Sequence, residues 1–210
     1  MQLLLCSATE HEIIPFLESG NHQNNVEILI TGVGLMAATY AITKKVYENR
    51  PQFIIQAGLA GSLDHSLALT KVVLVENETV GDLGVEEQNQ FISISELNLQ
   101  NKNDFPWQEN KLHNKLDAFT YSELPRVNAV SVNEISTNPS RIKYYRDVIG
   151  AHIETMEGAA LHFVALQQNI PFLQVRSLSN YIAERNKTKW KIREAIDHLN
   201  AELINLISNI

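Results

Sequence analysis

The sequence contains a single cysteine, Cys6, and no long hydrophobic run. One thiol cannot form an internal disulfide, which favours a reducing compartment. No stretch approaches the roughly 20 apolar residues that a membrane-spanning helix needs. The start of the chain also lacks the basic segment of a signal peptide. We therefore expect a cytoplasmic protein without a membrane partner.

Basic residues are scarce as well, with 17 Lys and Arg against 24 Asp and Glu and a formal net charge of −7. A generic nucleic-acid-binding domain shows the opposite balance, with basic residues clustered on one face, so no nucleic-acid partner is expected. The remaining composition, 44% hydrophobic and 20% charged, excludes a disordered chain, a collagen and a coiled coil. The length of 210 residues predicts a single domain spanning 1–210.

The pattern along the chain predicts an α/β fold. Short apolar runs, rather than strict alternation, indicate strands that are covered on both faces. Strands are expected at 2–8, 26–31, 52–57, 71–76, 126–132 and 171–179. Helices are expected at 34–47, 136–149, 157–168 and 187–207, the last of them amphipathic. This alternation indicates a domain built around a mainly parallel sheet. The segment 81–125, rich in Asn, Gln, Asp and Glu, is expected to form an irregular excursion with short strands, and such long loops are often functional.

Two glycine-rich turns follow predicted strands. The first, with Gly32 and Gly34, opens a helix and matches the GxGxxA form of a dinucleotide fingerprint. The acidic residue expected about 20 positions further on is missing from 52–57. A dinucleotide-binding oxidoreductase therefore remains only as an alternative from another class. The second turn, 58–62, follows the next strand, and the pair predicts a ligand crevice at the carboxyl edge of the sheet.

Three polar segments are expected at the same edge. Glu12, just past the first strand, can act as a general base, although a solvated helix start would look the same. His11 beside it has no second histidine at ligand spacing, so no metal site is predicted. Glu157 opens a helix and can accept hydrogen bonds from a sugar diol, or can simply begin that helix. The run 177–181 can read the edge of a base or form a turn, and it lacks a recognisable catalytic triad.

Taken in order, these motifs resemble those of the nucleoside phosphorylase and nucleosidase superfamily. The matching segments are ATEHE at 8–12, TGVG at 31–34, GLAG at 58–61, MEGAA at 156–160 and RSLSN at 176–180. The resemblance covers nearly the whole chain. It implies a three-layer α/β/α sandwich with a central mixed, mainly parallel sheet, a purine nucleoside as the small-molecule substrate, no metal or other cofactor, and a homodimer or larger homo-oligomer.

The resemblance also implies roles for individual residues. Glu12 would activate the attacking water, and Glu157 would hold the ribose hydroxyls with Met156 against the sugar. Asn180 would contact the purine. The further residues expected to bind substrate are Gly58, Ser179 and Ile135.

Within the superfamily the chain looks most like the futalosine hydrolases. The pointers are ETVGDLG at 78–84 followed by Phe91, ETMEGAA at 154–160, and SNY at 179–181 followed by Arg185 and Asn186. Methylthioadenosine nucleosidases, which release adenine, carry Asp in place of Asn180. An amide can donate to N7 or to a 6-oxo group, which favours release of hypoxanthine. The resemblance thus implies hydrolysis of futalosine in menaquinone biosynthesis. An adenine-releasing nucleosidase and a purine nucleoside phosphorylase are the alternatives on the same fold.

The positions of the arginines along the chain help to decide whether water or phosphate is the nucleophile. Phosphorylases of this superfamily place arginines before the GxxG turn and past the first strand, whereas this chain has Gln56 and no arginine there. Because the arginine fork suits phosphate, its absence favours water. Thr31 and Ser62 can still donate to an anion, so phosphate stays open. The excursion is expected to shape the pocket for the 5′ substituent, with Arg185 as a candidate partner for its carboxylate.

Overall fold

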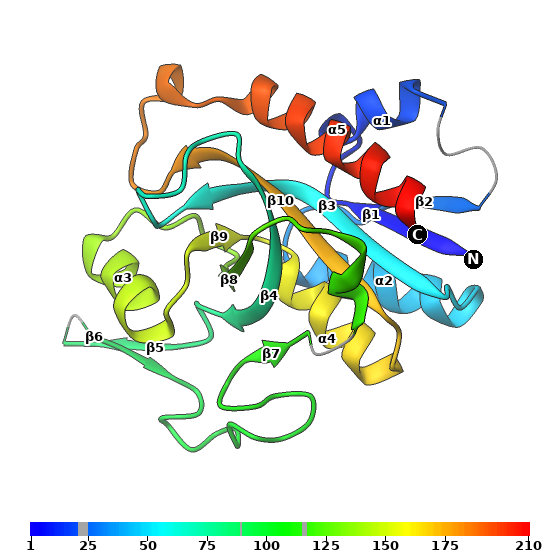
Figure 1. The fold of residues 1–210 in the computed structure, drawn as a ribbon. Coiled ribbons are helices and arrows are strands. Elements are labelled where there is room, and N and C mark those ends of the chain that lie inside the picture. The colour runs from blue at the N-terminus through cyan, green and yellow to red at the C-terminus, as the bar shows by residue number, and fades with distance from the viewer. Residues whose placement is uncertain (21–24, 89, 115–116) are drawn as a thin grey trace.

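A mixed eight-stranded sheet forms the centre of the computed structural model, which describes residues 1–20, 25–88, 90–114 and 117–210 (Figure 1). Its strands are β1 (Leu3–Ser7), β2 (Val26–Ile30), β3 (Phe53–Ser62), β4 (Val72–Val80), β7 (Leu112–His113), β8 (Arg126–Ser131), β9 (Ile153–Thr155) and β10 (Phe172–Tyr181). The α-helices are α1 (Ile14–Glu18), α2 (Leu35–Glu48), α3 (Pro139–Tyr144), α4 (Gly158–Gln168) and α5 (Ile192–Asn209).

The sheet is mixed and mainly parallel, as the sequence predicts. Parallel pairs join β1 to β2 and β3, β3 to β10, β4 to β8, and β8 to β9. Antiparallel pairs join β10 to β4, β3 to β9, and β4 to β7. The pairings β3-β10-β4-β8-β9-β3 close into a five-stranded barrel, from which β1 and β2 extend. The expected three-layer sandwich is not confirmed in this form, because closure depends on pairings between strands far apart in the sequence.

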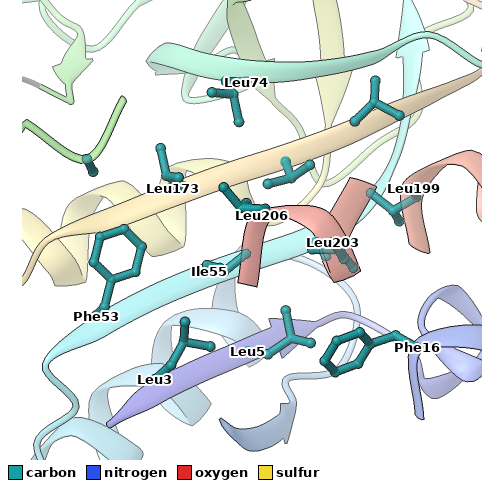
Figure 2. Packing of buried hydrophobic residues seen from close by; sticks show 14 of the residues in the cluster. Leu3, Leu5, Phe16, Phe53, Ile55, Leu74, Leu173, Leu199, Leu203 and Leu206 are labelled. Atoms are coloured by element: carbon teal, nitrogen blue, oxygen red, sulfur yellow. The ribbon is translucent and has the colours of Figure 1, made fainter. Parts of the chain in front are cut away.

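Helices cover both faces of the extension formed by β1 and β3. Along β1, Leu3 and Leu5 belong to one buried cluster, and Leu4 and Cys6 belong to another. Figure 1 shows α1 and α5 on one side of these strands and α2 and α4 on the other. Figure 2 shows the first cluster, to which α1 and α5 contribute Phe16, Leu199, Leu203 and Leu206. A strand buried on both faces reads as a continuous apolar run, which explains why the sequence identified it.

Several elements differ from their predicted limits. Residues 58–62 are not a turn after β3 but its continuation, so Gly58 and Gly61 lie inside a strand. The short strand β9 was not predicted, since three residues carry no periodicity. The helix expected at 136–149 is α3, capped by Asn138, followed by a π-helical turn at Tyr145–Ile149. At the chain's end, Lys187–Lys189 is a separate 3-10 turn before α5.

The excursion 81–125 contains short strands, as expected. β5 (Gly84–Glu87) and β6 (Gln90–Ser93) form a separate two-stranded antiparallel sheet, and Asp117–Tyr121 forms a 3-10 turn. In the part of the chain that the structure describes, no helix is both long and apolar enough to cross a bilayer.

One edge of β3 positions the candidate site. β10 pairs with β3 along Ile54–Ser62 and so takes up one edge. On the other edge, β1 pairs with Phe53–Gln56 and β9 pairs with Gly61–Ser62. Among the described strands, none pairs with 57–60 on that edge. The backbone of β3 is therefore left accessible to side chains and ligands in a gap between β1 and β9.

Candidate active site

A cavity of about 350 Å³ opens at this gap. Its walls come from the segments after β1 and β2, the edge of β3, the junction of β9 with α4, and the end of β10 and beyond. The residues predicted from sequence that line it are Glu12, Ile135, Met156, Glu157, Ser179 and Asn180. Gly58 stands directly behind Glu12 rather than on the cavity wall. The fold thus brings the predicted set to one place.

The Glu12 carboxylate is held by four donors. Its Oε2 accepts hydrogen bonds from the Thr9 amide and hydroxyl, both at 3.1 Å, and from the Ser7 hydroxyl at 3.2 Å. Its Oε1 accepts from the Leu59 amide of the open β3 edge at 3.0 Å. Thr9 and Glu12 form a capping box at the 3-10 turn Glu10–Glu12. The same contacts that stabilise this turn therefore also fix the carboxylate in the cavity.

The Glu157 carboxylate is buried between β9 and α4, with 5% of the residue exposed. Its Oε1 accepts a hydrogen bond of 2.9 Å from the Gly34 amide, and its Oε2 lies 3.9 Å from Nη1 of Arg176. Burial raises the pKa of Glu157, while the Arg176 charge and the Gly34 amide act in the opposite direction. The negative charge of Glu157 is therefore stabilised by the buried guanidinium of Arg176.

The glycine-rich turn before α2 holds side chains of its own chain. The Gly34 amide donates to Glu157, and the Leu35 amide donates to Oδ1 of Asn133 at 3.2 Å. In a dinucleotide-binding fold these first amides of the helix would face a pyrophosphate. Because protein acceptors take that place here, the motif has a structural reason other than cofactor binding.

The fold brings an arginine from a distant part of the chain, Arg176, beside the second glycine-rich segment, although the sequence has none next to that segment. Arg176 lies on β10 opposite Gly58, and a Cβ at Gly58 would stand 2.3 Å from its Nη1 and 2.9 Å from Glu12 Oε1. Only glycine lets both groups approach the strand this closely. The guanidinium is 1% exposed and also donates to Gln56 Oε1 at 2.8 Å. One signal in the sequence could have revealed this buried arginine. Gln174 and Arg176 are polar residues at alternate positions of an apolar strand.

At the other end of the cavity, a β-bulge aims Asn180. The register of β10 against β3 shifts between Leu178 and Asn180, which places Asn180 opposite Gly61. The Ser179 hydroxyl donates to Oδ1 of Asn180 at 2.8 Å. This bond orients the amide so that its NH₂ group faces Gly61, where a Cβ would lie 3.4 Å from Nδ2. Nδ2 donates one hydrogen to the Tyr181 carbonyl oxygen at 3.2 Å, so the amide keeps one N–H as a hydrogen-bond donor at the cavity wall.

A buried polar network supports the junction that carries Met156 and Glu157. Glu78 accepts from Gln174 Nε2 at 2.9 Å, Thr155 Oγ1 at 3.1 Å and Ser131 Oγ at 3.0 Å. Ser131 Oγ in turn accepts from the Ala159 amide in the first turn of α4 at 2.8 Å. Burial raises the pKa of Glu78 to about 7, and its hydrogen bonds and the Arg176 charge oppose that rise. The network fixes α4 against the barrel.

The mouth of the cavity is formed by more exposed residues. Ile135 is 48% exposed, and Arg185 lies 5.6 Å from the ring of Trp190, which also lines the cavity. Within a single chain, the described residues of the excursion 81–125 do not line it. The expected role of the excursion in shaping the pocket stays a prediction. Among the described residues, no group of three or more His, Cys, Asp or Glu could hold a metal ion.

Comparison with known proteins agrees with this architecture. The sequence matches the profile of the phosphorylase superfamily over residues 11–209. It is 29% identical to a futalosine hydrolase of Thermus thermophilus over 214 residues, covering 93% of this chain and 91% of the relative. The native structure of the futalosine hydrolase of Helicobacter pylori has a TM-score of 0.84 at 14% identity, covering 100% of this chain and 98% of that one.

A second solved structure has the same fold. The 5′-methylthioadenosine/S-adenosylhomocysteine nucleosidase of Colwellia psychrerythraea, in complex with adenine, has a TM-score of 0.81 at 17% identity. It is matched over 100% of this chain and 95% of its own. With the profile spanning nearly the whole sequence, the chain belongs to the phosphorylase superfamily.

Proposed function

We propose that this protein hydrolyses the N-glycosidic bond of a purine nucleoside, with futalosine as the substrate and hypoxanthine and dehypoxanthine futalosine as the products. The observation that carries the proposal is the composition of one cavity. It joins a hydrogen-bonded carboxylate, Glu12, and a buried carboxylate, Glu157, to an oriented amide donor, Asn180. The relative from Thermus thermophilus carries the same activity in its name.

One of the two carboxylates binds the sugar, and the other activates the attacking water. As the bond from C1′ to N9 lengthens, positive charge develops on the ribose, and carboxylates favour such oxocarbenium-like geometry. Glu157 grips the 2′- and 3′-hydroxyls, and Met156 lies against the ribose. Glu12 takes the proton from the attacking water, a role worth on the order of 10²–10⁴-fold in rate. The Leu59 amide and the capping contacts keep Glu12 in place for this step.

The amide of Asn180 serves the base. Negative charge collects on the departing purine, and a preorganised donor at that point is worth roughly 3–4 kcal/mol. An amide cannot give up a proton, so the leaving base must itself disperse charge. The 6-oxo group of hypoxanthine does so, which is why we favour this base over adenine. Ser179 holds the amide in the donating orientation, and Ile135 borders the base.

Water rather than phosphate is the proposed nucleophile. Arg176 lies against β3 at Gly58, and its guanidinium donates to Gln56 and faces Glu157. With only 1% of Arg176 exposed, this guanidinium does not offer the accessible fork that phosphate prefers. The exposed Arg185 at the mouth is placed to meet a carboxylate on the 5′ substituent.

We also propose a homo-oligomer formed through α2. Met36, Tyr40 and Tyr47 lie on one face of this helix and are 87%, 70% and 75% exposed. Ile30 and Val33 extend the apolar surface toward the cavity, and Val33 lines it. Large exposed apolar patches of this kind mark interaction sites. A second copy, docking isologously here, would cover the patch beside the active-site mouth. We further propose that the enzyme acts in the cytoplasm, in menaquinone biosynthesis.

One assay separates this function from its alternatives. The protein is incubated with futalosine, inosine and methylthioadenosine, each with and without phosphate, and the released base is identified by chromatography. Hypoxanthine from futalosine, at a rate independent of phosphate, is the expected result. Adenine from methylthioadenosine would instead indicate the adenine-releasing nucleosidase, and a phosphate requirement would indicate a phosphorylase. No release from any substrate would overturn the proposal.

A further inference from the structure

Glu154, in the middle of β9, is a buried carboxylate with one unused oxygen. It is 5% exposed and lines the cavity. Its Oε1 accepts a hydrogen bond of 3.1 Å from the Ser136 amide, whereas its Oε2 has no partner among the described residues. Burial raises the pKa of Glu154, the Ser136 contact opposes the rise, and the nearby Asp82 adds to it. A buried acceptor of this kind gains from a donor that a ligand can supply.

The strand register relates Glu154 to Asn180. Gly61 of β3 is paired with Glu154 of β9 on one edge and with Asn180 of β10 on the other. Residues directly opposite each other on adjacent strands point to the same face. With strands about 4.8 Å apart, the backbones of Glu154 and Asn180 are separated by roughly 10 Å. This row therefore has a polar side chain at each end and, in the middle, a glycine that adds no side chain of its own.

The middle of the row has an apolar surface. A Cβ at Gly61 would lie 2.2 Å from Cδ1 of Ile182, so Ile182 packs directly on the glycine. Ile182 also lines the cavity. A flat aromatic ligand can lie against such a surface while its two edges meet the polar groups at the ends of the row. A purine, which carries polar atoms on opposite edges, is a flat ligand of this kind.

The two ends of the row distinguish one purine from another. A 6-oxopurine carries a hydrogen on N1, whereas the N1 of adenine is an acceptor. A carboxylate only accepts hydrogen bonds, while the Asn180 amide can donate to N7 of either base. From the row of Glu154, Gly61 and Asn180 we infer that Glu154 accepts the N1 hydrogen of the base and selects 6-oxopurines over adenine. The inference rests on the proposed function and adds the residue that determines its base specificity.

The discriminating variant is Glu154→Gln. The Ser136 amide needs an acceptor, so the new amide keeps its oxygen there and turns its NH₂ group toward the base. That group repels the N1 hydrogen of a 6-oxopurine and suits the N1 acceptor of adenine. We expect kcat/KM on futalosine to fall at least a hundredfold, and kcat/KM on its 6-amino counterpart to rise, so that the preference reverses. Glu18→Gln, the same change at an exposed residue at the end of α1, is the matched control.

The outcomes separate the inference from the proposed function. An equal loss on both substrates, or no loss, would overturn the role of Glu154 and leave the function standing. If the variant does not fold, the wild-type enzyme is tested on N1-methylated futalosine. A loss of at least a hundredfold supports the inference, and unchanged kcat/KM overturns it.

If the wild-type enzyme cleaves neither nucleoside, the proposed function fails. The role of Glu154 is then tested by measuring how the protein binds the free bases. Calorimetric titration with free hypoxanthine and with free adenine is then compared between wild type and Glu154→Gln. A hypoxanthine affinity at least tenfold weaker in the variant, without a matching loss for adenine, supports the inference. Equal affinities in the two proteins overturn it.

Discussion

Replacing Glu12 by glutamine tests its role as the general base separately from the hydrogen bonds that hold its side chain. The carboxylate accepts from the amides of Leu59 and Thr9 and from the hydroxyls of Ser7 and Thr9. Glutamine offers one acceptor oxygen and one NH₂ group. The hydroxyls can rotate to accept from that group, but the two backbone amides cannot. In either orientation, therefore, one backbone amide faces an NH₂ group and loses its acceptor.

The structure sets the size of both expected effects. One backbone amide left without an acceptor costs about 1–3 kcal/mol, which a domain with the usual 5–15 kcal/mol of stability tolerates. Loss of a positioned general base lowers turnover by roughly 10²–10⁴-fold. We therefore expect Glu12→Gln to remain folded, with a modestly lower free energy of unfolding and at least a hundredfold lower kcat.

Two measurements test this expectation. Urea unfolding gives the free energy, and release of hypoxanthine from futalosine gives kcat. Ser7→Ala is the control, because it removes one donor to Oε2 and leaves the carboxylate in place. It should keep most of the activity. Near-native turnover in Glu12→Gln would refute the assignment of Glu12 as base. A loss in Ser7→Ala as large as that in Glu12→Gln would show that positioning alone explains the effect.

Four further predictions concern other parts of the molecule. Asn180→Ala should lower kcat by at least tenfold while shifting the melting temperature little, and a large stability loss with intact turnover would contradict its role at the base. Gly58→Ala places a methyl group 2.3 Å from the Nη1 position of Arg176, so kcat/KM should drop more than tenfold, and an active, stable variant would show that the close approach is dispensable. The pKa of Glu78 is raised to about 7, so its contribution to stability is complete below the ordinary pKa of about 4.5 and is lost as pH rises through about 7. The free energy of unfolding of Glu78→Gln should therefore depend less on pH between 5 and 8 than that of wild type. Equal pH dependence in the two proteins would argue against this titration. Tyr40→Glu should reduce the mass measured by light scattering to that of a monomer, and an unchanged mass would exclude the α2 face as the interface.

Local patterns carried most of the secondary structure. β1 is buried on both faces and reads as an uninterrupted apolar run, and α5 shows its buried face at helical spacing. The Glu12 site is also local, because its capping box joins Thr9 to Glu12 within one turn. Elements without periodicity were missed or misplaced. β9 is only three residues long, and residues 58–62 looked like a turn because two glycines interrupt the apolar run.

The sequence by itself determined the α/β class, the order of most elements and several of the residues that meet in the cavity, since these follow from hydrophobic spacing and from motifs in a fixed order. Tertiary structure alone decided the closure of the barrel, the open edge of β3, the position of Arg176 behind Gly58 and the row from Glu154 to Asn180. Each of these depends on register between strands far apart in the chain. The hydrophobic pattern of one strand fixes which of its faces is buried, but it does not name the distant strand with which that strand pairs.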